Sequence, residues 1–269
     1  FERSPMYHDA LLWDLCDLIH LAERAGLPAL SSRRRDWLAV LERGLHWSST
    51  LRHPDGDIAF FNDAAFGIAP SLDNLRAYHR RLADGSVVER AVDGTGTHYF
   101  ADSGYAALDL GPGHRALLDL APVGPDYQPG HAHADTLSFE LSLFGRRLLV
   151  NSGTSRYGVD RERLRQRATA AHNTVEVDGQ DSSEVWSGFR VARRARPTVT
   201  RFENEGGRIH VSAGHDGYRR LAGDNVHYRD WQARPGELLI QDRVSGAHGQ
   251  AVARFHLHPE VQAQADGDG

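Results

Sequence analysis

The sequence predicts an α+β protein in which helices come first and a large antiparallel β-sandwich follows. Through roughly the first 85 residues, apolar side chains recur at three- and four-residue steps, as they do along one face of a helix. Farther along the chain, short strand-like segments alternate with turns that contain glycine or proline, a pattern typical of a sandwich. With 269 residues, 40% of them hydrophobic, the chain is long enough to bury a core.

Three helices are expected in the N-terminal part, because each of these segments carries a stripe of apolar side chains on one face. Gly26 and Pro28 end the first of them. Between the second and third helices, residues 53–70 are expected to form a loop, since they contain a Pro-Asp-Gly turn signal. The three helices cover residues 9–26, 32–47 and 71–83.

Four β-hairpins are expected in the C-terminal part, each with a glycine in its turn. Successive hairpins predict antiparallel sheets packed as a sandwich. The change of pattern places the domain boundary between a helical part, residues 1–88, and a sandwich, residues 89–269. The hairpins pair residues 106–110 with 116–120, 137–143 with 148–150, 198–202 with 208–212, and 226–233 with 238–244.

Composition excludes several classes of protein. The formal net charge of −5 argues against a dedicated nucleic-acid-binding protein, because such a protein needs positive charge to neutralise phosphates. No stretch of about 18 apolar residues is present, so no membrane span is expected. The single cysteine, Cys16, cannot form an intramolecular disulfide and is expected to be a core thiol.

The densest chemical signal lies in residues 131–141. If this segment is extended, His131, His133 and Asp135 continue the row of side chains that Leu137 begins on the core-facing side. Two imidazoles and a carboxylate at such a position can bind a metal or transfer protons. The alternative that the residues leave open is a hydrogen-bonded polar edge without a chemical function.

Two further segments are expected to converge on the same place. Asn151 ends the next strand of the hairpin, and His172 leads into a later strand, although both residue types are also common in turns. An arginine-rich stretch that includes Arg156 and Arg167 suits recognition of carboxylate or sulfate, and the alternative is a solvated, ion-paired surface. Tyr157 in the same stretch is a candidate for stacking on a sugar ring.

Five motifs in this order resemble those of the heparinase II/III family of polysaccharide lyases. The resemblance spans nearly the whole chain and implies an incomplete (α/α) toroid followed by a large antiparallel β-sandwich. Residues 1–88 would then be the last helices of the toroid, and residues 89–269 a sandwich truncated at its C-terminus. The motifs are FERSPMYH at 1–8, HAHADTLSFEL at 131–141, LLVNSGT at 148–154, AHNTVEVDGQDSSEVW at 171–186 and ARFHLHPEV at 253–261.

The resemblance implies cleavage of uronic-acid-containing polysaccharides by β-elimination. The substrate would be a heparan sulfate-like glycosaminoglycan or a bacterial exopolysaccharide such as alginate. Tyr7 corresponds to the proton-carrying tyrosine of the SPxYH motif, and His131 to the first histidine of the HxH pair. A phenol, with a reference pKa of about 10, is a competent acid, and beside cationic groups it is also a competent base once deprotonated.

The resemblance also implies a structural zinc ion. Its ligands would be the second histidine of the HxH pair, an aspartate that ends the next strand, and the histidine of the AHN motif. Those positions are His133, Asn151 and His172 in this chain. Because a neutral amide is a poorer zinc ligand than a carboxylate, we expect the metal to be absent, weakly held or completed by a neighbour such as Asp135.

An acidic polysaccharide partner and a periplasmic or secreted location are further implications of the resemblance. The family residue that neutralises the substrate carboxylate would lie before the first residue of this chain, so poor turnover is expected from the chain alone. A catalytically weak carbohydrate-binding sandwich is the alternative function. A cupin-like metal enzyme is also conceivable, but Glu140 follows His133 at too great a distance for the cupin pattern, and a minimal cupin has no such helices. The sequence gives no signal for the oligomeric state.

Overall fold

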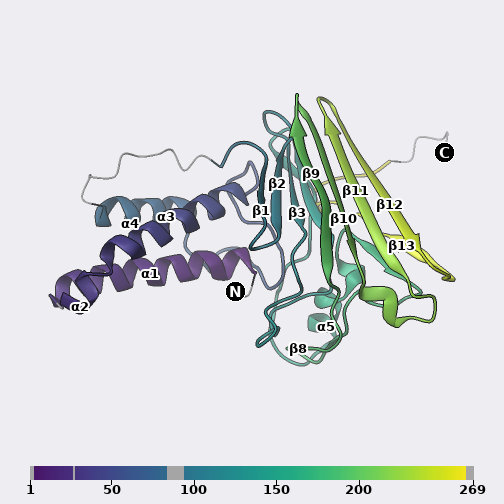
Figure 1. Cartoon of the computed structure of the whole chain (residues 1–269), viewed down its shortest axis with the longest axis horizontal. Coiled ribbons are helices and arrows are strands. Elements are labelled where there is room, and N and C mark those ends of the chain that lie inside the picture. Colours follow the sequence, from purple (N-terminus) through teal and green to yellow (C-terminus); the bar gives the residue numbers. More distant parts are fainter. Residues whose placement is uncertain (1–2, 27, 84–93, 265–269) are drawn as a thin grey trace.

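The computed structural model describes residues 3–26, 28–83 and 94–264, and Figure 1 shows helices on one side of a stack of antiparallel sheets. The helices are α1 (Pro5–Ala25), α2 (Pro28–Ser31), α3 (Arg34–Thr50) and α4 (Leu72–Leu82). The first helix starts four residues earlier than predicted, because Ser4 caps it and Pro5 occupies its first position. Its end at Gly26, in the left-handed conformation at φ 62°, is as predicted.

The long helices pack on one another through the apolar stripes that the sequence predicts. Leu12 and Ile19 of α1 contact Leu41 and Leu45 of α3 in a buried cluster, and Leu75 of α4 completes it. Cys16 lies in this cluster as a buried free thiol. None of the helices that the structure describes is both long and apolar enough to cross a membrane.

Two antiparallel sheets form the sandwich, which confirms the predicted fold class. The first has the strand order β1-β2-β3-β4-β5, and the second the order β12-β11-β10-β9. All four expected hairpins are present: β2 with β3, β4 with β5, β9 with β10, and β11 with β12. The strands are β1 (His98–Phe100), β2 (Tyr105–Asp109), β3 (Arg115–Asp119), β4 (Phe139–Leu143), β5 (Arg146–Leu149), β9 (Pro197–Glu205), β10 (Arg208–His215), β11 (Val226–Arg234) and β12 (Glu237–Ser245).

The main core lies between these two sheets. Leu118 and Phe139 of the first sheet meet Val211 and Trp231 of the second in one buried cluster. A separate cluster joins the end of α3 and the following loop to the other face of the first sheet, through Phe61 and its neighbours. The loop that the sequence predicts at residues 53–70 is therefore packed against the sandwich.

Shorter elements link the sheets on the side of the candidate site. They include one helix that the sequence analysis did not predict, which is capped by Asp160 through a 2.8 Å hydrogen bond from the main-chain nitrogen of Arg163. These elements are α5 (Arg161–Arg167), β6 (Val175–Val177) paired with β13 (Ala251–Ala253), β7 (Val185–Trp186) paired with β8 (Arg190–Val191), and two 3₁₀ turns, Thr169–Ala171 and Gly217–Arg220.

One structural prediction is wrong, because residues 131–138 are not a strand. The strand β4 begins only at Phe139, and Leu137 has φ 63°, which breaks the alternation of side chains. Residues 131–135 instead form an irregular loop. The predicted domain boundary at residues 88 and 89 lies outside the described residues.

Candidate active site and metal-binding group

Tyr7 and His131 lie side by side, although they are 124 positions apart in the chain. Tyr7 is in the first turn of α1 and His131 is in the loop before β4, and their ring centroids are 4.7 Å apart. The hydroxyl of Tyr7 is hydrogen-bonded to that of Tyr157 at 2.7 Å. Tyr157 is 48% exposed, and both Tyr7 and His131 are partly exposed. The arrangement therefore puts a phenol and an imidazole together where a ligand can reach them.

The start of α1 is fixed to the sandwich by the backbone around the helix cap. The Ser4 hydroxyl accepts a hydrogen bond from the main-chain nitrogen of Tyr7 at 3.3 Å and donates one to the carbonyl of Asp63 at 2.5 Å. The carbonyl of Arg3 accepts from Asn62 at 2.8 Å and from Tyr105 at 2.7 Å. These bonds explain how a helical residue is positioned against a loop of the sandwich.

Asp63 is the centre of the site, and the sequence analysis missed it. Its fully buried carboxylate accepts hydrogen bonds from His131 at 2.7 Å, His133 at 2.8 Å and Thr154 at 2.7 Å. It also forms a bidentate ion pair with Arg163. Burial alone would raise the pKa of Asp63, but the hydrogen bonds from the two histidines and Arg163 hold it well below its usual range. The only signal for Asp63 in the sequence is an acidic residue within a largely apolar stretch of the predicted loop at residues 53–70.

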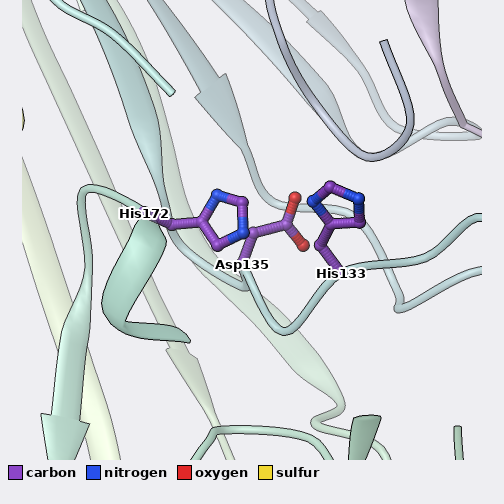
Figure 2. A group of neighbouring side chains, drawn as sticks. All are labelled: His133, Asp135 and His172. Carbon is purple, nitrogen blue, oxygen red and sulfur yellow. The ribbon is translucent and has the colours of Figure 1, made fainter. Parts of the chain in front are cut away.

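His133, Asp135 and His172 form a buried group that can hold a metal, with one ligand atom from each within 4.8 Å of the others. Figure 2 shows the Asp135 carboxylate between the two imidazoles. Nδ1 of His133 and Nε2 of His172 are buried without a hydrogen-bond partner among the described residues. Burial raises the pKa of Asp135. Burial also lowers the pKa of His172 well below its usual value, and the nearby His133 lowers it further.

These features fit a zinc ion. Two neutral imidazoles and a carboxylate are a usual zinc donor set, and unpartnered buried nitrogens are costly unless something binds them. Asn151, the predicted ligand, lies beside this group: its side chain is buried, its amide nitrogen lies 3.4 Å from Glu140, and its oxygen accepts from Nδ1 of His172 at 3.4 Å. In this conformation Asn151 contacts Nδ1 of His172, whereas the buried atom of that ring without a partner among the described residues is Nε2. Glu140, the acid of a cupin-like site, instead pairs with His53 at 2.9 Å.

The predicted substrate-binding residues have different surroundings. Tyr157 lies in the site beside Tyr7, and Arg156 is exposed near it, 3.7 Å from Asp160. Arg167, in contrast, is completely buried and donates to the carbonyls of Ala132 at 3.0 Å and Ser187 at 3.2 Å. In this conformation Arg167 holds the histidine loop against the β7–β8 hairpin and offers no open face to a substrate.

Phe189, which was not predicted from the sequence, forms one wall of the site. Its ring stacks on Tyr157 at a centroid distance of 6.0 Å and an angle of 14°, and it contacts His131 edge-on at 6.2 Å. The guanidinium of Arg163 lies 5.4 Å from the Tyr157 ring and 5.5 Å from the Phe189 ring. Aromatic faces of this kind suit a sugar ligand.

Comparisons with known proteins agree with this architecture. The family model described as "Heparinase II/III-like, C-terminal" matches residues 92–269. A heparin-sulfate lyase from Bacteroides stercoris is 24% identical over 200 residues, which are 70% of this chain and 30% of that protein.

Solved structures of a heparan sulfate lyase, HepC, from Pedobacter heparinus and of a heparinase III gene product have the same fold, with TM-scores of 0.71 and 0.75 and identities of 20% and 21%. This chain is covered to 96% and 98% by these matches, but it spans only 40% and 41% of the solved chains. The helices and the sheets correspond together, so the likeness is not limited to the sandwich. The chain belongs to the heparinase II/III-like family.

Proposed function

We propose that the protein is a polysaccharide lyase that cleaves a uronic-acid-containing polysaccharide by β-elimination, with Tyr7 and His131 as proton carriers. The observation that carries this proposal is the 4.7 Å contact between the two rings on an accessible part of the molecule. The similar proteins described as heparin-sulfate and heparan sulfate lyases favour an acidic polysaccharide substrate. A periplasmic or secreted location belongs to the same proposal.

The reaction requires one proton to leave carbon and one to reach oxygen. A base takes the proton from C5 of the uronate, the electron pair forms the C4–C5 double bond, the C4–O4 bond breaks, and O4 receives a proton. Water is not consumed. A phenolate at Tyr7 can take the first proton, and the resulting phenol can supply the second.

Tyr157 supports Tyr7 in this role. Burial and the hydrogen bond with Tyr7 raise the pKa of Tyr157, so its hydroxyl keeps its proton when Tyr7 is deprotonated. Across the 2.7 Å contact, Tyr157 then donates to the Tyr7 oxygen and stabilises the phenolate. His131 packs on the Tyr7 ring and lies edge-on to the Tyr157 ring, with its Nδ1 held by Asp63. Arg156, which is exposed and precedes Tyr157 in the chain, is the arginine that we assign to the substrate carboxylate or sulfate.

His133, Asp135 and His172 would hold a zinc ion. When bound, zinc supplies a cross-link between the loop that carries His131 and the segment that follows α5. His131 is two residues from His133, so the same cross-link restricts the position of the proposed catalytic imidazole. Metal ligands in this arrangement support the reaction without taking part in it.

The test is substrate cleavage by the full-length protein, because this chain spans about 40% of the solved relatives. Heparan sulfate, hyaluronan, alginate and bacterial exopolysaccharides are offered, and the absorbance of the new double bond is followed. Tyr7→Phe should lower kcat by about 10²- to 10⁴-fold, because it removes the proton carrier. Tyr127→Phe is the matched control, since Tyr127 is 76% exposed.

Equal rates for wild type and Tyr7→Phe would show that Tyr7 does not carry the proton. Binding of an acidic polysaccharide without any cleavage would favour the alternative function, a carbohydrate-binding sandwich. Either result can be obtained with the same preparations.

A further inference from the structure

The two histidines of the HxH pair contact the same carboxylate through different ring nitrogens. Oδ2 of Asp63 lies 2.7 Å from Nδ1 of His131, and Oδ1 lies 2.8 Å from Nε2 of His133. The side chains of Asp63 and His133 are completely buried, and that of His131 is 21% exposed. The two rings therefore differ in which nitrogen contacts the carboxylate: Nδ1 in His131 and Nε2 in His133.

The carboxylate of Asp63 can only accept hydrogen bonds. The ion pair with the completely buried Arg163 keeps Asp63 ionised, and Thr154 donates a further hydrogen bond at 2.7 Å. Each imidazole nitrogen that contacts Asp63 must accordingly carry a hydrogen. In its neutral form each imidazole carries only one N–H, so its lone pair then lies on Nε2 of His131 and on Nδ1 of His133.

The two lone pairs belong to different parts of the site. Nδ1 of His133 is a buried atom without a partner among the residues described, and its ring belongs to the group that includes Asp135 and His172. The ring of His131 packs against Tyr7. A carboxylate that fixes the N–H of a metal-binding histidine is a common supporting interaction.

We propose that Asp63 is a positioning residue that holds the two histidines in opposite tautomers, so that His133 presents Nδ1 to a metal and His131 presents Nε2 to the reaction. The role assigned to His131 rests on the proposed function, whereas the tautomers do not. One carboxylate thereby couples the metal-binding group to the proton-transfer pair.

Asp63 is itself held in place by its main chain. Its nitrogen donates to the carbonyl of His131 at 3.1 Å, and its own carbonyl accepts from Ser4 at 2.5 Å. Arg163 is fixed in turn by a hydrogen bond from its Nε to the carbonyl of Gly188 at 3.0 Å. These contacts hold Asp63 and its ion-pair partner at the place where the carboxylate reaches both imidazoles.

The direct test is the tautomeric state of both histidines in the unmodified protein. Protein with ¹⁵N-labelled histidine is treated with a chelator, kept at a pH above 7.5, and examined by long-range ¹H–¹⁵N correlation. His131→Gln and His133→Gln assign the signals. The expected result is the Nδ1–H form for His131 and the Nε2–H form for His133. The same tautomer at both positions, or averaging between tautomers, would overturn the proposal.

Asp63→Asn supplies the second test. An amide presents one acceptor and one donor in place of two acceptors, so at least one histidine should change tautomer, and zinc affinity should fall by about 10- to 100-fold in a chelator competition. Thr154→Val is the control: it removes one hydrogen bond from Asp63, leaves both imidazole contacts, and should retain both tautomers.

If Asp63→Asn alone does not fold, the double variant Asp63→Asn/Arg163→Met removes both buried charges and is measured instead. Unchanged tautomers and zinc affinity in a folded variant would contradict the role of Asp63. The outcomes for the two proposals are separable. Opposite tautomers in a protein without lyase activity would refute the proposed function alone, and identical tautomers in an active lyase would refute this inference alone.

Discussion

Replacing Arg229 by methionine should destabilise the folded protein, because truncating one partner of a buried ion pair leaves the other charge without compensation. Arg229 is completely buried, and its guanidinium lies 2.7 and 2.8 Å from the two carboxylate oxygens of Asp242. It also donates to the main-chain carbonyls of Leu137 at 2.9 Å and Asn173 at 2.6 Å. Arg229 thereby ties the second sheet to the two segments that carry the metal-binding group.

The expected loss is about 3 kcal/mol, at the lower end of the range of about 3–5 kcal/mol for a broken buried pair. The lower end applies because Asp242 keeps a 2.7 Å contact with His227 and is 19% exposed. For a protein of this size, 3 kcal/mol corresponds to a decrease in Tm of about 6–12 °C. Zinc affinity should fall as well, since Leu137 and Asn173 lie within two residues of Asp135 and His172.

Thermal unfolding followed by circular dichroism measures the effect on stability. Arg234→Met is the matched control on the same strand, because Arg234 forms an exposed ion pair with Glu237 that should contribute less than about 1 kcal/mol. A Tm for Arg229→Met within about 2 °C of the wild type would refute the reasoning. So would an equal loss in the Arg234 variant, because the effect would then not depend on burial.

Two further predictions concern stability. Burial lowers the pKa of His215 and His227. Below pH 6.5 the unfolded chain therefore binds protons that the folded protein does not, and urea unfolding should show a stability that falls as the pH is lowered from 7.5 to 5.5. An unchanged midpoint would contradict this. Gly153→Ala should lower the free energy of unfolding by about 1–3 kcal/mol or more. The reasons are that φ of Gly153 is 61° and that a Cβ there would lie 2.6 Å from the carbonyl oxygen of Ala64. Gly206→Ala, with φ 57° and open space, should cost less, and equal costs would exclude the clash.

The fold could be predicted largely from the sequence because its hairpins are local. Turns such as those at Gly111 and Gly236 have glycines at φ 109° and 79°, conformations that other residues rarely adopt, and alternating segments flank them. The irregular loop before β4 could not be predicted in the same way. It depends on Leu137 at φ 63°, a conformation that nothing in a leucine's local sequence indicates.

The site could be predicted only in part. Tyr7 was selected only through the resemblance of motifs, and so was its pairing with His131, since no periodicity relates residues so far apart in the chain. Asp63 is 68 positions from His131, and only the folded chain brings the two together. Arg167 was expected at the surface because charged residues are rarely buried, yet main-chain carbonyls satisfy its guanidinium in the interior.

The amide at position 151 is compatible with a metal site because of the charges around it. Glu140 is completely buried, and its Oε1 lies 3.4 Å from the Asn151 amide nitrogen. An aspartate at 151 would place a second buried carboxylate against Glu140, and like charges at that distance in the interior are strongly unfavourable. The amide instead donates to Glu140 and accepts from His172, while Asp135 brings a carboxylate to the opposite side of the His172 ring. The chain thus retains one acidic donor beside the two histidines without placing two carboxylates in contact.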